Sequence, residues 1–202
     1  MLKTLKRRDV IILITFWLTA ICTVGIVLIF FLIRATQFSE PVYQLETNDF
    51  TALALYPVAQ EAAEKWEEDV RFISASATWN NASVAEFEEP IDWVYRFYSP
   101  SQQRIIFVIV TSDQRAIVQP HLVRVRRELR VIDPDDWNVD SPVAVEAWLN
   151  SGGGEWLQQA SSRVVSIQLT FNIERDLPVW TISGFNPETG QQTRFSLGAK
   201  VR

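Results

Sequence analysis

The only histidine of the chain, His121, is the residue on which most hydrolytic chemistry would depend. A Ser-His-Asp or Cys-His device needs such a general base, and a catalytic zinc site needs several His or Cys ligands. His121 follows Pro120 in a polar segment, the chain has no G-x-S-x-G motif, and Cys22 is its only cysteine. We therefore predict a surface histidine and a protein that is not an enzyme, with no catalytic residue, metal site or cofactor.

Acidic clusters are the second candidate for chemistry. Residues 133–140 (DPDDWNVD) gather carboxylates of the kind that bind calcium, but the spacing differs from an EF-hand loop and lacks a central glycine. We interpret this stretch as a solvated linker that caps the following helix. Carboxylates for glycoside hydrolysis could come from residues 67–69 and 86–89. Nothing in the sequence brings those two runs together, so solvated faces are the better interpretation.

A basic stretch interrupts the acidic C-terminal part of the chain and is the best candidate for binding a partner. It consists of Arg124, Arg126, Arg127 and Arg130. In a strand, alternation would place Arg124 and Arg126 on one face and the neighbouring valines on the other. These arginines could dock an acidic partner or lipid headgroups. They could instead fold back and neutralise the acids of residues 133–136, which is a purely structural role.

The charge of the chain is unevenly distributed. Its net charge is −5, yet residues 1–34 carry five basic side chains and one acidic one, which leaves 14 basic and 23 acidic side chains in the remainder. An acidic domain gains nothing from counterion release at a phosphate backbone. Nucleic acid is therefore not an expected partner.

Residues 10–33 form a run of 24 residues without a charged side chain. A helix of this length spans about 36 Å, enough to cross a hydrocarbon core about 30 Å thick. A cleavable signal peptide has a shorter apolar region and a small-residue cleavage site, which Arg34-Ala35-Thr36 does not supply. We predict a transmembrane helix, with membrane lipid as one partner of the protein.

The flanks of this apolar run predict its orientation. Four basic residues precede it, namely Lys3, Lys6, Arg7 and Arg8. Acidic residues dominate after it. The positive-inside rule therefore places residues 1–9 in the cytoplasm as a short tail. Residues 34–50 follow the helix as a tether. The predicted location is the cell membrane, crossed once, with the C-terminal domain outside the cytoplasm.

A sequence pattern occurs twice after the tether. Residues 56–62 (YPVAQEA) match residues 141–147 (SPVAVEA) at an offset of 85, and Trp93 and Trp180 follow at an offset of 87. Two different features, a helix-start motif and a tryptophan, thus recur at almost the same offset, which indicates two copies of one unit. We assign the first copy to residues 51–132 and the second to residues 133–202.

Each copy is expected to contain a helix followed by three or four antiparallel strands, which is the α+β fold class. Proline opens the first turn of a helix at low cost, so Pro57 and Pro142 predict two helix starts. Tyr56 is a poor N-cap, so the first helix could begin nearer Asn48, and it should run to about Asp69. Glycines at 152–154 should interrupt or end the second helix.

Strand patterns follow each expected helix. Apolar residues alternate with polar ones over residues 91–97 and 165–173, which predicts strands with one wet face. The continuous β-branched run at 104–111 predicts a more central strand. Turns are expected at 112–114 and 187–190. The pattern does not decide whether the two copies share one sheet.

Short motifs in the second copy resemble the PepSY domain family. They are DSP at 140–142, GGGEWL at 152–157 and PVWTIS at 178–183, and the likeness covers residues 138–202 best and 50–126 more loosely. The resemblance implies a helix lying on a curved, cystatin-like antiparallel sheet in each copy. It also implies a module that binds or restrains a partner, such as a peptidase, and does not catalyse.

Two functions of different classes are therefore expected. The chain could be a non-enzymatic binding or regulatory module outside the membrane, which holds a peptide or protein on its sheet or strand edges. The alternative is a single-pass accessory subunit of a larger membrane complex, held there through its anchor.

Overall fold

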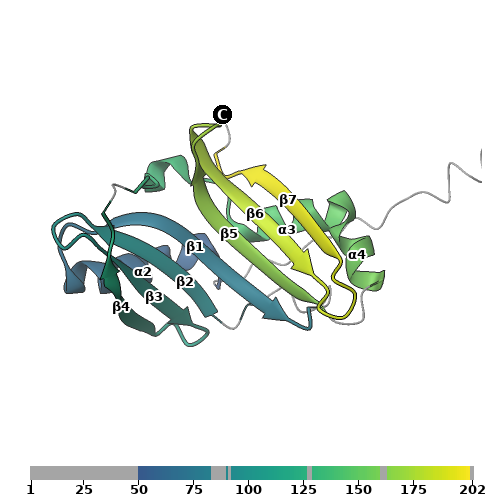
Figure 1. The fold of residues 1–202 in the computed structure, drawn as a ribbon, viewed down its shortest axis with the longest axis horizontal. Coiled ribbons are helices and arrows are strands. Elements are labelled where there is room, and N and C mark those ends of the chain that lie inside the picture. Colours follow the sequence, from purple (N-terminus) through teal and green to yellow (C-terminus); the bar gives the residue numbers. More distant parts are fainter. Residues whose placement is uncertain (1–49, 83–89, 91, 127–128, 160–162, 201–202) are drawn as a thin grey trace, which may run out of the picture. The chain divides into compact units, whose positions relative to one another are not determined.

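Seven strands form a single antiparallel sheet in the order β4-β3-β2-β1-β5-β6-β7 (Figure 1). The strands are β1 (Arg71–Asn80), β2 (Asp92–Ser99), β3 (Arg104–Thr111), β4 (Ala116–Arg124), β5 (Val164–Asn172), β6 (Leu177–Phe185) and β7 (Gln192–Gly198). With the helices, this sheet makes the fold α+β, as predicted. The strands of the two halves join through β1 and β5, where Ala77 pairs with Ile167, so both halves contribute to one sheet.

The computed structural model describes residues 50–82, 90, 92–126, 129–159 and 163–200. The expected tail, membrane helix and tether, with Lys3, Lys6, Arg7 and Arg8, lie outside these ranges apart from Phe50. Within the described ranges, no helix combines the length and the apolar character needed to cross a membrane. All the elements belong to one compact unit, Tyr43–Arg202.

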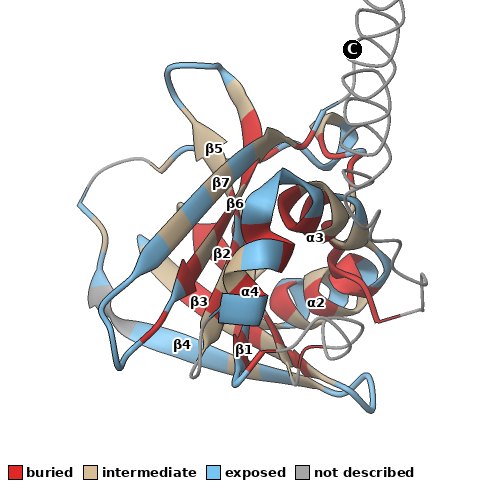
Figure 2. Ribbon diagram, turned by 90° about the vertical axis from the view of Figure 1, so that its right-hand side faces the viewer, coloured by how far each residue is buried: buried red, intermediate tan, exposed pale blue. Residues whose placement is uncertain are grey.

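Helices cover one side of this sheet (Figure 2). They are α2 (Ala52–Trp66), α3 (Ser141–Trp148) and α4 (Gly154–Gln159), with a π-helical turn (Leu149–Gly153) between the last two and a 3-10 turn, η2 (Pro134–Asp136), before α3. The core lies between the helices and the sheet. Its largest fully buried side chains include Trp93, Trp148 and Trp180.

Alternation along the strands explains which side packs on the helices. In β2, Trp93, Tyr95 and Phe97 are at most 1% exposed, whereas Val94 and Arg96 between them are half-buried. Side chains in a strand point alternately to opposite faces, so the aromatic residues pack under the helices and the others face away. The strands expected at 91–97, 104–111 and 165–173 are thus confirmed, and the β3 run is central because β2 and β4 flank it.

The first helix begins and ends differently from the prediction. It starts at Ala52, where the Thr51 hydroxyl accepts a hydrogen bond from the Ala54 N–H at 3.2 Å, and it ends at Trp66 instead of near Asp69. Pro57 therefore lies inside the helix, not in its first turn. The matching turn of α3 begins at Ser141, so Pro142 occupies the predicted position and Pro57 does not.

The second helix is interrupted at the glycines, as predicted. Gly152 has a φ of +102°, a left-handed conformation that glycine adopts at little cost, and Ser151 also leaves helical geometry. The chain then resumes as α4, where Trp156 packs against Gly184 of β6. On either side of the break, α3 packs on β6 and β7, and Trp156 of α4 reaches β6.

The two halves repeat one packing device. The Trp93 indole N–H donates to the Phe50 carbonyl at 3.1 Å, and the Trp180 indole N–H donates to the Val139 carbonyl at 2.7 Å. Each acceptor immediately precedes the N-cap residue of its own half's helix. The two rings also meet edge to face, with centroids 6.3 Å apart. The tryptophan match in the sequence thus corresponds to a repeated contact between strand and helix start.

Candidate functional site

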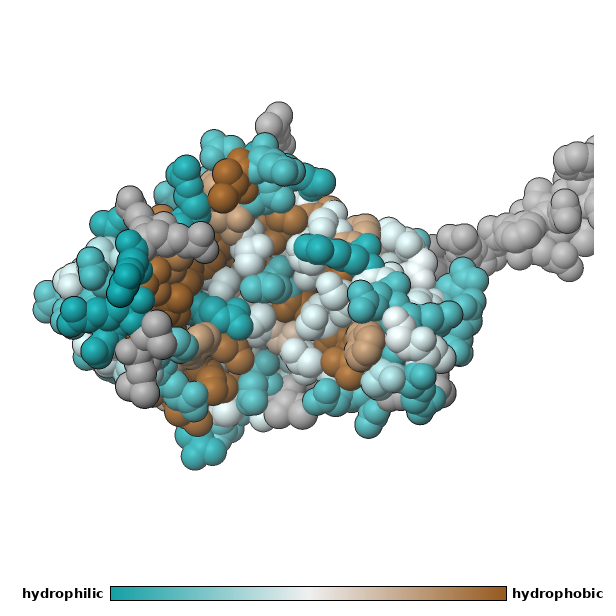
Figure 3. Space-filling view, viewed as in Figure 1, coloured by the Kyte–Doolittle hydropathy of each residue, from teal (hydrophilic) through white to brown (hydrophobic). Residues whose placement is uncertain are grey.

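We call the side of the sheet away from α2, α3 and α4 the open face. One cross-strand row on it runs from Ile117 through Ile109, Val94, Ser76, Gln168 and Thr181 to Ser196. The row is apolar on β4, β3 and β2 and polar on β1, β5, β6 and β7. Figure 3 looks onto this face and shows its largest apolar area over the part that β2, β3 and β4 form.

Arg96 lies at the boundary between the apolar and polar parts of the open face. Its Nη1 lies 3.2 Å from the Ser74 hydroxyl and 3.3 Å from the Ser76 hydroxyl, and it donates to both. On its other side, the guanidinium carbon is 5.5 Å from the centre of the Phe107 ring. Arg96 pairs directly with Ser74 and Phe107 in the sheet register, so β1 and β3 fix both contacts. The serines and the ring hold the cation in one position.

Burial changes the chemistry of Arg96. Desolvation lowers the pKa of the guanidinium, because removing water disfavours the charged form. Arginine nevertheless stays protonated at neutral pH. Three ion pairs join described residues, and none of them includes Arg96. A half-buried cation therefore faces solvent without a carboxylate from the described part of the chain.

A shallow hollow of about 240 Å³ lies beside Arg96 on the same face. It is lined by Ser76, Ala77, Thr78, Asn80, Asp92 and Val94. Asp92 and Arg96 are four residues apart on β2, so both face the same way, about 13 Å apart along the strand. The hollow thus offers hydroxyl, amide and carboxylate groups, and two of its lining residues, Ser76 and Val94, are neighbours of Arg96.

The polar groups of the open face bond to one another and to the backbone. Catalysis by a serine needs a base within hydrogen-bond reach of the hydroxyl. The Ser76 hydroxyl instead donates to the Val94 carbonyl at 3.5 Å and accepts from Arg96. His121 is exposed on β4, as predicted, and its ring lies 5.8 Å from that of Phe107. The geometry supplies fixed donors and apolar surface.

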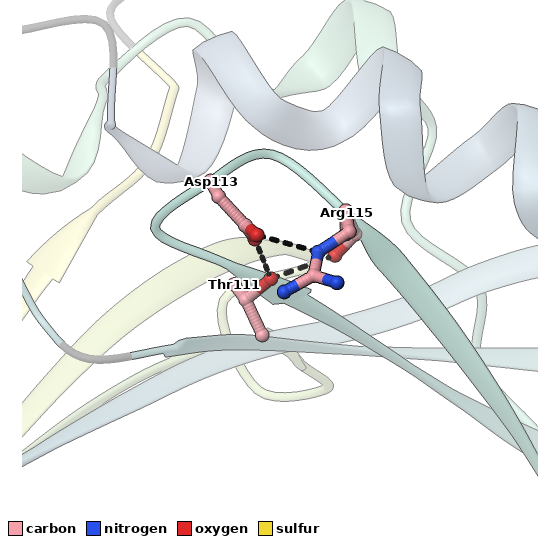
Figure 4. Close-up of polar contacts among 3 residues, drawn as sticks. All are labelled: Thr111, Asp113 and Arg115. Atoms are coloured by element: carbon pink, nitrogen blue, oxygen red, sulfur yellow. Dashed lines mark hydrogen bonds and ion pairs between the residues drawn. The ribbon is translucent and has the colours of Figure 1, made fainter.

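A second polar cluster closes the hairpin between β3 and β4 (Figure 4). The Thr111 hydroxyl donates to Asp113 Oδ1 at 2.5 Å, and Arg115 Nε lies 2.5 Å from Asp113 Oδ2. The Thr111 hydrogen bond and then Arg115 lower the pKa of Asp113. The Thr111 N–H also donates to the Arg115 carbonyl at 3.0 Å, so the cluster holds the expected turn in place.

The predicted basic stretch lies at the end of the edge strand β4. Arg124, Arg126 and Arg130 are exposed, and Arg127 lies outside the described residues. The strand ends at Arg124, so the expected alternation does not extend to Arg126. None of the three described arginines forms an ion pair with residues 133–136, where Asp136 pairs with Lys200. A role of these arginines in binding a partner stays a prediction.

The acidic runs have structural roles where they are described. Asp140 is the N-cap of α3, as the capping interpretation predicted, and Asp133 also caps the 3-10 turn η2. Asp69 Oδ1 and Oδ2 accept from the Ser99 hydroxyl and the Ser101 N–H, each at 2.6 Å. Burial raises the pKa of Asp69, but these hydrogen bonds lower it by more. Residues 86–89 lie outside the described residues, and the described part of the chain contains no cluster of three metal-ligating side chains.

Six aromatic residues of the strands are buried: Trp79, Trp93, Tyr95, Phe97, Tyr98 and Trp180. Burial raises the pKa of Tyr95 well above its usual value, and its hydroxyl donates to the Ala52 carbonyl at 2.6 Å. Sequence reasoning missed Arg96. Its signal was an arginine at an outward position of a strand whose inward positions are all aromatic.

Three comparisons with known proteins found no match. No family model matches the chain, no curated protein matches its sequence, and no solved structure matches its fold. The functional argument therefore rests on the open face itself.

Proposed function

We propose that this protein is a non-enzymatic binding module that restrains a protein partner through the open face of its sheet. The observation that carries the proposal is the apolar area beside Arg96. Ile117 is 49% exposed there, and Phe107 and Ile109 are half-buried next to it. An antiparallel sheet with one solvated face normally shows polar residues on that face. A contiguous apolar area on such a face marks an interaction site.

The proposal includes the finer architecture that the sequence predicts. It comprises a transmembrane helix at residues 10–33 and, outside the cytoplasm, two PepSY-like units at 51–132 and 133–202. The order of elements supports two units, because each half runs from helix to antiparallel strands. The paired contacts of Trp93 and Trp180 at the two helix starts support it further. By this resemblance, the partner is a peptidase or another protein of the cell envelope.

Photo-crosslinking tests the proposal with two matched positions. Ile117 on the open face and Val143 on α3 are 49% and 53% exposed, so a crosslinking amino acid fits at either site without disturbing the core. We would place p-benzoylphenylalanine at one position or the other in the full chain and irradiate the cells that produce it. Mass spectrometry would then identify the adducts.

The expected result is a discrete adduct with one protein from position 117 and none from position 143. Equal adducts from both positions would indicate random collision and contradict the use of the open face. The absence of any adduct at position 117, with the protein present at its normal level, would reject the proposal.

A further inference from the structure

Arg96 specifies the chemistry of the partner, and this inference rests on the proposed binding function of the open face. A guanidinium carries five N–H donors. Described residues supply acceptors to Nη1 alone, from the hydroxyls of Ser74 and Ser76. The remaining donors of Arg96 therefore face the solvent side of the sheet or the plane of Phe107. The two serines and the Phe107 ring hold the guanidinium that carries these donors.

The position of Arg96 carries an energetic cost that a ligand would offset. Charged side chains are rarely buried unless they are paired, because desolvation disfavours the ion. Two neutral hydroxyls and an aromatic face stabilise the guanidinium only in part. An anion that approaches from the solvent side would complete the pairing and exclude more water. Charge complementarity thus favours an anionic group over Arg96.

We infer that Arg96, Ser74 and Ser76 bind the carboxylate of an acidic side chain on a partner segment that lies across the open face. Arginine binds carboxylates through two parallel N–H···O bonds, which fixes the direction as well as the charge of the ligand. The serine hydroxyls hold Nη1 and so orient the fork. The hydroxyls can also donate to a carboxylate oxygen after rotation.

The surroundings of Arg96 define what flanks the acidic residue. Phe107 lies directly beside Arg96 on β3, and Val94 follows two residues away on β2. Adjacent strands lie about 4.8 Å apart and alternate residues of one strand about 7 Å apart. Ile109 and Ile117 extend the apolar surface by one further step. The fitting segment therefore carries an acidic residue with apolar side chains one or two positions away.

The charge of the site distinguishes a carboxylate from a phosphate. A phosphate group carries up to two negative charges and is usually bound by several cations. Arg71 of β1 also lies on the open face, because it pairs with Tyr98, two residues from Arg96 on β2, and it is exposed. A more distant arginine on this face is Arg194 of β7, which pairs with Ser183 of β6. Four strand spacings separate β2 from β7, which is about 19 Å. Arg96 is the half-buried cation that two hydroxyls hold in place, so the built site matches a single carboxylate, and a phosphate would also have to draw on the exposed Arg71.

Two synthetic peptide pools test the inference on the full chain in detergent micelles. Both are fluorescein-labelled nonapeptides with amidated C-termini, mixed valine, leucine, isoleucine and phenylalanine on either side of the centre, and serine elsewhere. One pool has glutamate at the centre and the other glutamine. Fluorescence anisotropy should show about tenfold tighter binding of the glutamate pool, the value of one charge-assisted contact.

Variants connect this preference to Arg96. Arg96→Met keeps most of the side-chain volume. It should lower the affinity for the glutamate pool to the affinity for the glutamine pool. Arg194→Met removes the same charge from the same face, about 19 Å away, and should leave the tenfold preference intact. Ser74→Ala with Ser76→Ala should reduce the preference without abolishing it. The comparison of the two pools on the unaltered chain stands even if Arg96→Met fails to fold.

Several outcomes would overturn the inference. Equal binding of the two pools to the unaltered chain would show that the site does not recognise a carboxylate. Tight binding of the glutamine pool once its C-terminus is a free acid would assign the site to a chain end. Binding of neither pool, together with a lower melting temperature of Arg96→Met, would show that a segment of this chain already occupies the site. An adduct at position 117 with equal pools leaves the proposed function standing, whereas the absence of adducts rejects that function itself.

Discussion

At the scale of single residues, one carboxylate connects the two halves of the chain. Asp140 Oδ1 accepts from the Ser141 N–H at 2.6 Å and from the Leu53 N–H at 3.0 Å, so it caps α3 and also binds the first turn of α2. Ser141 adds a bond from the Ala52 N–H to its hydroxyl at 3.1 Å. Helix N-termini leave N–H groups without partners and favour negative charge, so both helix starts converge on the same acid.

Replacing Asp140 by alanine should therefore cost more than removing an ordinary cap. We expect Asp140→Ala to lower the free energy of unfolding by about 2 to 3 kcal/mol, since one N-cap contributes about 1 kcal/mol and further N–H groups lose their acceptor. Asp140→Asn keeps an oxygen acceptor and should lose less. The measurement is urea unfolding followed by tryptophan fluorescence.

Asp135 provides the matched control for this prediction. It is an exposed acid in the adjoining 3-10 turn, and Asp135→Ala should change the free energy of unfolding by less than about 0.5 kcal/mol. An equal loss for Asp135→Ala and Asp140→Ala would contradict the role of Asp140 as a shared cap.

At the scale of elements, the break between α3 and α4 depends on two glycines for different reasons. Gly152 supplies a left-handed backbone, with a φ of +102° and open space around it. Gly153 instead gives room to Trp148, because a Cβ at this position would lie 2.4 Å from Cε2 of that ring. Trp148 is 1% exposed, so the ring is held in the core and has little freedom to move away.

Gly153→Ala should consequently disturb the packing of α3. We expect a loss of about 2 kcal/mol in the free energy of unfolding, in the range of an overpacked core. Gly198→Ala is the control, because a Cβ there would meet its nearest atom, Leu177 Cδ1, at 3.7 Å, an ordinary contact. Thermal or urea unfolding of both variants would check the difference, and equal stability of the two would count against the clash with Trp148.

The same elements show what the sequence could and could not predict. Alternation identified β2 and β5 because a strand's period of two is visible in the residues themselves, and the continuous β-branched run identified β3. The match between Pro57 and Pro142 suggested a common first turn, and the alternative start near Asn48 lay on the other side of the true start at Ala52. Thr51, a good N-cap, marked the true start. Alternation placed Arg96 at an outward position, but its contacts with Ser74 and Phe107 could not be predicted, since they depend on pairing across three strands.

At the scale of the whole molecule, pairing of β1 with β5 joins the two halves into one sheet with a continuous open face. The pairing is long-range, from Ser74 with Thr170 to Asn80 with Val164, and it places the polar row of the second half beside Arg96. Neither half alone would present both the apolar and the polar part of the open face. The sheet ends in two edge strands, and β4 carries Pro120, which interrupts backbone pairing with another chain. Both features favour recognition through the face over strand addition at β4.

The proposed orientation in the membrane completes this picture, and the chain's single cysteine makes it testable. Cys22 lies inside the apolar run at residues 10–33, so a second cysteine can report on either side. We expect Val143→Cys, 53% exposed on α3, to react with a membrane-impermeant maleimide added to intact spheroplasts. Thr4→Cys in the basic tail should react only after the membrane is opened, because the cations before the apolar run retain that end inside. Labelling of Thr4→Cys before lysis, with Val143→Cys protected, would show the opposite orientation, with the open face in the cytoplasm.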